Sequence, residues 1–125
     1  MKICLSSTGK GIESKLDIRF GRCQYFVIVD TETNEAKAIY NKGADSPQGA
    51  GVTAADTVLE QGVDVVITGN VGPNAMKLLS KGDIEIYKGT ENSLKDNIEK
   101  FKEKSLNKIT KSVKAHSGLK NRWDR

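Results

Sequence analysis

The segment VVITGNVGPNAMKLL, residues 65–79, predicts a buried strand that leads through a short loop into a helix. Its apolar, β-branched start without alternation is typical of a parallel strand covered on both faces. Pro73 suits the first turn of a helix, which apolar residues at helical spacing continue. The intervening loop contains more glycine and asparagine than a plain turn requires, at Gly69, Asn70, Gly72 and Asn74. We infer that something approaches the backbone closely at this junction.

The rest of the chain continues the alternation of strands and helices. Apolar or alternating stretches predict strands at residues 2–7, 25–30, 35–41, 63–68 and 83–89. Helical spacing and capping residues predict helices at residues 52–62, 73–81 and 94–104. With short, right-handed connections, this order predicts an α/β fold with three helices. The expected sheet is mixed and five-stranded, in the order 3-2-1-4-5, with strand 2 antiparallel.

The length and charge of the chain indicate one domain with a distinct C-terminal segment. The 125 residues are enough for one hydrophobic core but too few for two. Seven basic residues and one acid lie in residues 104–125, and because the whole chain carries +4, residues 1–103 carry a net charge of −2. We predict a domain over residues 1–103 and a basic tail, partly helical or disordered, over 104–125. Without a leader-like start or a run of roughly 18 apolar residues, a cytoplasmic protein without a membrane span is expected.

The predicted topology brings the glycine-rich loops to one edge of the sheet. The C-terminal ends of the parallel strands share this edge with the start of strand 2, and open α/β sheets bind ligands there. Five segments are expected at the edge: residues 6–11, 17–23, 46–51, 68–74 and 88–93. Three of them lead into helices, whose first turns offer unpaired N–H groups and about half a positive charge each. The edge therefore suits an anion such as a phosphate or a sulfur-containing metal cluster.

The candidate cofactor-binding residues lie in three of these segments. They are Arg19, Arg22, Cys23, Gly49, Gly51, Gly69, Asn70, Gly72 and Asn74. The arginines would add full positive charge, which would lower the pKa of the Cys23 thiol and make it the candidate metal ligand. Each feature also has a purely structural interpretation. The glycines would permit tight turns, Cys23 would be a buried apolar residue, and the arginines would pair with Asp17 or Asp45.

The two cysteines are expected to be free thiols. Cys4 and Cys23 fall about four residue steps apart on paired strands, ~13 Å, which exceeds the ~7 Å limit on Cα separation in a disulfide. A single thiol near the edge falls short of the full set of thiolates that usually holds an iron–sulfur cluster. A cluster would therefore need a dimer, added thiols or sulfide, or a hold made mainly of hydrogen bonds.

Three stretches of the chain resemble one known family. They are RFGRC-x-YF-x-IVDTE from Arg19, GAG at residues 49–51 before a helix, and GVDVVITGNVGPNAMKLL at residues 62–79. Together, in this order within residues 1–103, they are similar to the dinitrogenase iron–molybdenum cofactor biosynthesis family, the NifX and NifB C-terminal-like proteins. The stand-alone archaeal and thermophile members are the most similar.

The resemblance implies both a fold and a role. The implied fold is a ribonuclease-H-like three-layer structure. The implied role is a small non-enzymatic carrier or scaffold that binds an iron–sulfur or iron–molybdenum-type cluster, or its precursor, at the C-terminal edge of the sheet. Its partners would be cluster donor and acceptor proteins, with a weak homodimer as a further expectation.

Two other functions stay open on the residues alone. An enzyme acting on a phosphorylated metabolite would share the anion site, but no nucleophile–base pair is identifiable at that edge. Asp30 and Asp64 fall at the opposite edge, so a ribonuclease-type carboxylate set cannot meet the glycine loops. An adaptor would instead use the basic tail, whose lysines and Trp123 suit nucleic acid, an anionic surface or a partner protein.

Overall fold

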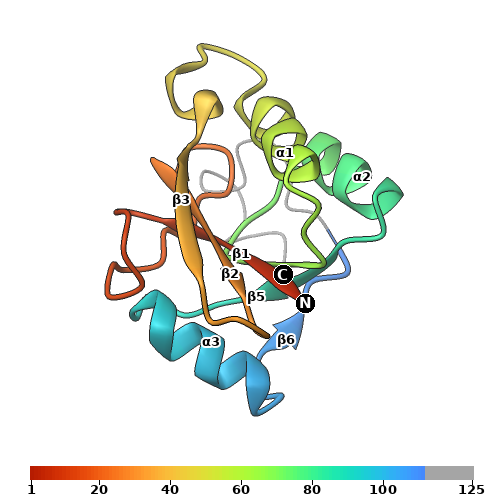
Figure 1. The fold of residues 1–125 in the computed structure, drawn as a ribbon. Helices are drawn as coiled ribbons and strands as arrows, with labels where there is room; N and C mark the ends of the chain where they lie inside the picture. The colour runs from red at the N-terminus through yellow and green to blue at the C-terminus, as the bar shows by residue number, and fades with distance from the viewer. Residues whose placement is uncertain (112–125) are drawn as a thin grey trace.

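The structure, a computed structural model, describes residues 1–111. Three α-helices and a mixed sheet form its regular elements (Figure 1). The strands are β1 (Lys2–Ser7), β2 (Tyr25–Asp30), β3 (Ala36–Tyr40), β4 (Val65–Thr68), β5 (Glu85–Lys88) and β6 (Asn107–Lys108). The helices are the 3-10 helix η1 (Lys42–Asp45), α1 (Ala50–Glu60), α2 (Pro73–Lys81) and α3 (Leu94–Lys102).

The sheet has the order β3-β2-β1-β4-β5-β6. Strand β2 is antiparallel to both of its neighbours, whereas β4 is parallel to β1 and to β5, which confirms the predicted order of the first five strands. The prediction of five strands is wrong, because β6 pairs antiparallel with β5. Two exposed polar residues, Asn107 and Lys108, are too short a stretch to produce a strand pattern in the sequence.

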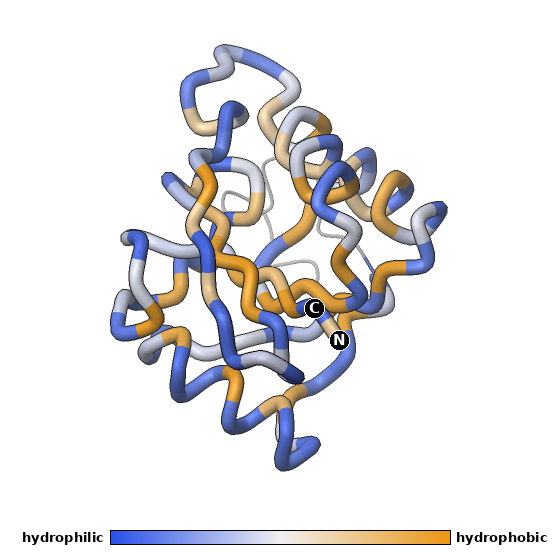
Figure 2. The backbone as a smooth tube through the Cα atoms, in the orientation of Figure 1, coloured by the Kyte–Doolittle hydropathy of each residue, from blue (hydrophilic) through white to orange (hydrophobic). Residues whose placement is uncertain are grey.

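Helices cover both faces of the sheet, so the domain has three layers (Figure 1). Alternate residues of each strand enter two separate cores, as the pleat requires. Cys4 and Val66 contact the core under α1 and α2, while Leu5 and Ile67 contact the core under α3. Figure 2 shows the consequence, with apolar residues concentrated on the central strands and polar residues on the loops and the outer faces of the helices.

The helix starts follow from local chemistry. Helix α1 begins at Ala50, two residues before its predicted start, because Gly49 takes the left-handed conformation (φ 69°) and turns the chain into the helix. Helix α2 begins at Pro73, as predicted. Helix α3 begins after Ser93, whose side chain accepts the Asp96 N–H at 3.0 Å, as the capping-box pattern indicated.

The predicted tail begins inside the described residues. Asn107 and Lys108 form β6, so the last helix does not continue through them. The prediction that involves Trp123 falls outside residues 1–111, and the boundary at residue 103 stays a prediction. No helix within residues 1–111 combines the length and the apolar character that crossing a membrane would require.

Candidate functional site

Three of the predicted loops meet at the C-terminal edge of the sheet. The 17–23 loop lies directly against the β4–α2 loop, where Arg19 and Asn70 form a parallel bridge. The Asn70 N–H donates to the Ile18 carbonyl at 2.7 Å, and the Phe20 N–H donates to the Asn70 carbonyl at 3.3 Å. Asn70 therefore holds the arginine loop through its backbone.

The glycines of these loops serve two different purposes. A Cβ on Gly69 would lie 2.5 Å from Ile18 Cβ, and one on Gly21 would lie 3.0 Å from Gly51 N. At Gly69 and Gly21 the close approach is therefore made by another loop of the same chain. A Cβ on Gly72 would have nothing within 4 Å. The backbone at Gly72 is open to its surroundings.

A shallow hollow of about 210 Å³ lies between the starts of α1 and α2. We call it the helix-start hollow, and its lining residues are Gly49, Ala50, Gly51, Val52, Gly72, Pro73, Asn74 and Ala75. The first helical N–H bonds are Thr53 to the Gly49 carbonyl and Met76 to the Gly72 carbonyl, so the preceding N–H groups lack intrahelical acceptors. With two helix starts and no carboxylate in its lining, this hollow favours an anion.

A second, polar hollow of about 330 Å³ contains the two candidate arginines. We call it the arginine hollow, and it is lined by Thr8, Asp17, Arg19, Arg22, Gln24, Tyr40, Ala44 and Asp45. The expected electropositive character is wrong for this hollow, because its two guanidinium groups are accompanied by two carboxylates. Tyr40 donates its hydroxyl to one of them, Asp45.

The pairing of Arg19 with Asp17, one of the interpretations left open by the sequence, is confirmed. Arg19 Nε and Nη2 donate to the two carboxylate oxygens at 3.1 and 3.0 Å, and the Arg19 N–H adds a bond of 2.9 Å. Burial of Asp17 opposes its ionisation, but the hydrogen bonds and charge of Arg19 outweigh burial and lower the pKa of the carboxyl. The Arg19 side chain remains 64% exposed.

Arg22 does not pair with Asp45. Its Nη1 donates instead to the carbonyls of Ser46 and Ala44, the latter at 3.4 Å. These two carbonyls end η1 and begin the loop that leads to α1. Arg22 therefore links the 17–23 loop to the segment in front of the helix-start hollow, while its guanidinium stays exposed enough to exchange a carbonyl for a charged ligand.

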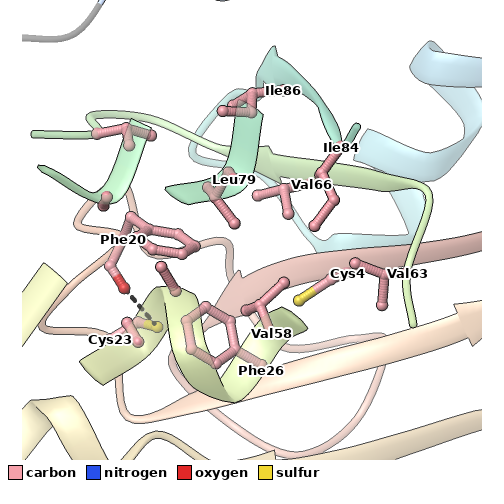
Figure 3. Packing of buried hydrophobic residues seen from close by; sticks show 14 of the residues in the cluster. Cys4, Phe20, Cys23, Phe26, Val58, Val63, Val66, Leu79, Ile84 and Ile86 are labelled. Carbon is pink, nitrogen blue, oxygen red and sulfur yellow. Dashed lines mark hydrogen bonds between the residues drawn. The ribbon is translucent and has the colours of Figure 1, made fainter. Parts of the chain in front are cut away.

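The structure places Cys23 in the core, and its side chain lines neither hollow. Cys23 is fully buried, and Figure 3 shows its sulfur turned toward the Phe20 carbonyl, to which Sγ donates at 3.4 Å. Burial raises the pKa of this thiol to about 12, so the predicted lowering is wrong. Both cysteines are free thiols, as expected, and the burial of Cys23 agrees with the structural alternative left open by the sequence. Within residues 1–111 no group of three or more His, Cys, Asp or Glu residues is arranged to hold a metal ion.

Sequence reasoning missed Asn41, which organises the loops around the site. This fully buried side chain donates from Nδ2 to the carbonyls of Cys23 (2.8 Å) and Gly21 (3.1 Å). Its Oδ1 accepts the Gly43 N–H at 2.9 Å and caps η1. One asparagine thus fixes the arginine loop against the segment before α1. Asparagine two residues before Gly43 favours a turn in the sequence, but the long-range partners of its side chain are not visible there.

The fold and the site define a small α/β protein in which the starts of two helices share one carboxylate-free hollow at the edge of the sheet. The model of the dinitrogenase iron-molybdenum cofactor family matches residues 1–104. The chain belongs to this family, which confirms the resemblance identified in the sequence. Its class is accordingly that of small, cofactor-related carriers or scaffolds.

Similar proteins come from archaea and bacteria. An uncharacterized protein of Methanocaldococcus jannaschii is 34% identical over 99 residues, which cover 77% of this chain and 84% of the relative. The apo form of the orange protein from Desulfovibrio gigas is similar with a TM-score of 0.83 and 29% identity, covering 87% of this chain and 92% of that protein. A NifB-type protein from Thermotoga is similar with a TM-score of 0.79 and 29% identity, covering 90% and 96%.

Proposed function

We propose that the protein is a small cytoplasmic carrier or scaffold for an iron–sulfur or iron–molybdenum-type cluster or its precursor, without an enzymatic activity of its own. The observation that carries this proposal is the helix-start hollow, where two helices direct unpaired N–H groups at one carboxylate-free space. The cluster is cargo, and the family of the chain supports that class of cargo. Arg19 and Arg22 would supply charge from the adjacent loop.

The groups available at the site favour binding of the cluster by hydrogen bonds and charge over binding by metal–thiolate bonds. Cys23, the predicted metal ligand, is buried and carries a raised pKa, so its sulfur would have to leave the core and lose a proton before it could bind metal. The helix-start hollow contains backbone N–H groups that need no rearrangement, and the exposed Arg22 guanidinium would only have to exchange a backbone carbonyl for the cargo. Sulfide ligands of a cluster carry negative charge and accept such hydrogen bonds.

Anaerobic reconstitution tests this proposal. The full chain is incubated with iron and sulfide, with and without molybdate, separated from excess reagents, and analysed for metal and sulfide per chain. The proposal predicts a coloured protein with a reproducible cluster content of up to one per chain. This content should fall as the salt concentration rises, because salt screens the attraction between the charged cluster and the protein. Colourless protein without iron or molybdenum under all of these conditions would contradict it.

The Cys23→Ala variant is the matched control for the mode of binding. Alanine keeps the site apolar and removes the only thiol near the edge in residues 1–111. If hydrogen bonds and charge hold the cargo, the variant retains the metal content of the wild type. A complete loss of metal in a folded variant would show that Cys23 ligates it, and the predicted thiolate role would then replace the hydrogen-bonded one.

The finer predictions about fold and partners complete the proposal. The ribonuclease-H-like assignment agrees with helices on both faces of a mixed sheet and remains part of this hypothesis. Cluster donor and acceptor proteins are the expected partners. A weak homodimer is also expected, and the apparent mass in solution as a function of protein concentration would detect it. Binding of nucleic acid or an anionic surface by residues 104–125 concerns a segment that lies largely outside the described residues.

A further inference from the structure

An apolar hollow of about 420 Å³ lies beside α3, on the face of the sheet opposite α1 and α2. We call it the aromatic hollow, and it is lined by Tyr87, Phe101, Lys102, Lys104 and Leu106. The rings of Tyr87 and Phe101 meet edge to face with centroids 5.1 Å apart. Both rings and Leu106 are only half-buried, while the two lysines are exposed. The hollow thus combines a partly open apolar lining with two exposed cationic side chains.

The backbone conformation at residue 104 is one in which lysine is less favourable than glycine. The Lys104 N–H donates to the Phe101 carbonyl and the Ser105 N–H to the Lys100 carbonyl, which is the Schellman pattern that ends a helix. The residue at this position is left-handed, here with φ 61°, and glycine is the usual occupant. A lysine carries the strain of that conformation, so a role for its side chain would explain its presence.

We infer that the aromatic hollow docks a protein segment that presents an aromatic or aliphatic side chain flanked by acidic residues. The half-buried rings and Leu106 would receive the apolar side chain. Lys102 and Lys104 make no ion pair within residues 1–111, so both are available to the acidic flanks. The hollow lies away from the helix-start hollow, and a partner could occupy it while the cargo site stays accessible. The inference does not depend on what the cargo is.

Charge distinguishes this partner from two other occupants. The C-terminal residues 112–125 of the same chain contain four basic residues and one acid, so they share the sign of the two lysines. A nucleic acid needs a continuous track of cations along its phosphates. Near the hollow, the exposed carboxylate of Glu85 contacts the Tyr87 hydroxyl at 3.1 Å and interrupts such a track.

Selection of peptides from a random displayed library tests the inference. The bait is the full-length wild-type protein, and the Lys102→Glu, Lys104→Glu double variant serves for counter-selection. We expect enriched peptides with one aromatic or aliphatic anchor between Asp or Glu residues. A synthetic copy of the best peptide should shift the amide resonances of Tyr87, Phe101 and Leu106. Its Kd should rise roughly tenfold or more in the double variant, because the acidic peptide residues would then be repelled by glutamates instead of attracted by lysines.

The Lys104→Gly variant separates docking from a structural role. Glycine relieves the left-handed strain, so Tm should rise while peptide affinity falls. A rise in Tm with unchanged affinity would assign Lys104 a structural role only and overturn its part in docking. The whole inference is overturned if no peptide is enriched over the double variant, if the enriched peptides are basic, or if a short oligothymidylate binds at these residues and the acidic peptides do not.

Discussion

Arg19 and Asn70, which are 51 positions apart in the chain, pair across two loops, and this bridge sets the geometry of the candidate site. Asn70 bonds through its backbone to the residues on either side of Arg19. The Arg19 side chain then turns to the buried carboxylate of Asp17. The arginine is thus held through both its backbone and its side chain, although 64% of the side chain stays exposed.

The Asp17–Arg19 pair predicts an acid-sensitive contribution to stability. The pKa of Asp17 in the folded state lies below its ordinary value of 3.8, so the stabilisation is fully present above that value and is lost as the pH falls through the folded pKa. Asp17→Asn should lower the free energy of unfolding by about 1–2 kcal/mol at neutral pH. It should also flatten the pH dependence below pH 4. Urea denaturation of both proteins between neutral and acidic pH provides the measurement.

An equal pH dependence in the wild type and the Asp17→Asn variant would show that another group causes the acid sensitivity. Asp30 is the relevant comparison, because hydrogen bonds from the backbone N–H groups of Glu32 and Thr33 also lower the pKa of this exposed carboxyl. Asp30→Asn should therefore change the free energy of unfolding at acidic pH less than Asp17→Asn does, since exposed charges contribute little to stability.

Two glycines of the same loop should differ in how much an added methyl group destabilises the fold. At Gly69 the new Cβ would meet Ile18 Cβ at 2.5 Å and the Ile18 carbonyl oxygen at 2.6 Å, so Gly69→Ala should cost about 2–3 kcal/mol in the free energy of unfolding. At Gly72 the new Cβ meets nothing within 4 Å, and Gly72→Ala should change stability by less than about 1 kcal/mol. Chemical denaturation measures both. Equal costs would contradict the described packing of the two loops.

The burial of both cysteines predicts slow thiol chemistry. Burial raises the pKa of the Cys23 thiol to about 12, and burial with the nearby Cys23 raises that of Cys4. A disulfide-exchange reagent at pH 8 should react with neither thiol in the native state and with both after denaturation. Because the unfolded thiols ionise at lower pH than the folded ones, stability should fall as the pH rises above about 9. Fast reaction of one thiol in the native protein would contradict the buried position of Cys23.

Removal of Arg22 should weaken cargo binding more than it weakens the fold. The side chain joins two backbone carbonyls on an exposed segment, so Arg22→Ala should cost at most about 1 kcal/mol of stability. If the guanidinium contributes to holding an anionic cluster, the reconstituted metal content should fall severalfold, and Arg22→Lys should restore part of it. A metal content unchanged in Arg22→Ala would exclude this arginine from the site.

Sequence patterns predicted the strand order because the strands that fix it are strongly apolar and β-branched. VVIT and YFVIVD have unambiguous patterns, and right-handed connections leave few arrangements for them. The same reasoning failed at β6, whose two polar residues have no pattern of their own. It also failed at Cys23, because proximity to two arginines in sequence does not decide where a side chain points. That orientation depends on the long-range bonds made by Asn41 and on packing against Phe20.

The identity of the glycine contacts was likewise outside the reach of the sequence. The cluster in TGNVGPN indicated a close approach to the backbone, which is correct. At Gly69 the approaching group is Ile18 of the same chain, whereas Gly72 stays open. A one-dimensional pattern cannot distinguish these cases, because both positions are simply glycine in the sequence and only the fold shows which one is packed against another loop.

The central claim, that an anionic cargo lies at the starts of α1 and α2, is tested most directly at Gly72. Asp and Asn have nearly the same shape, both are favourable at a helix N-cap, and the position is open, so Gly72→Asp and Gly72→Asn should both fold. Only aspartate adds a negative charge to the helix-start hollow. Either side chain would accept the same first-turn N–H groups of α2, so the account predicts a difference that comes from charge: Gly72→Asp should bind the reconstituted cluster at least about tenfold more weakly than Gly72→Asn. Equal metal binding by the two folded variants would place the cargo elsewhere.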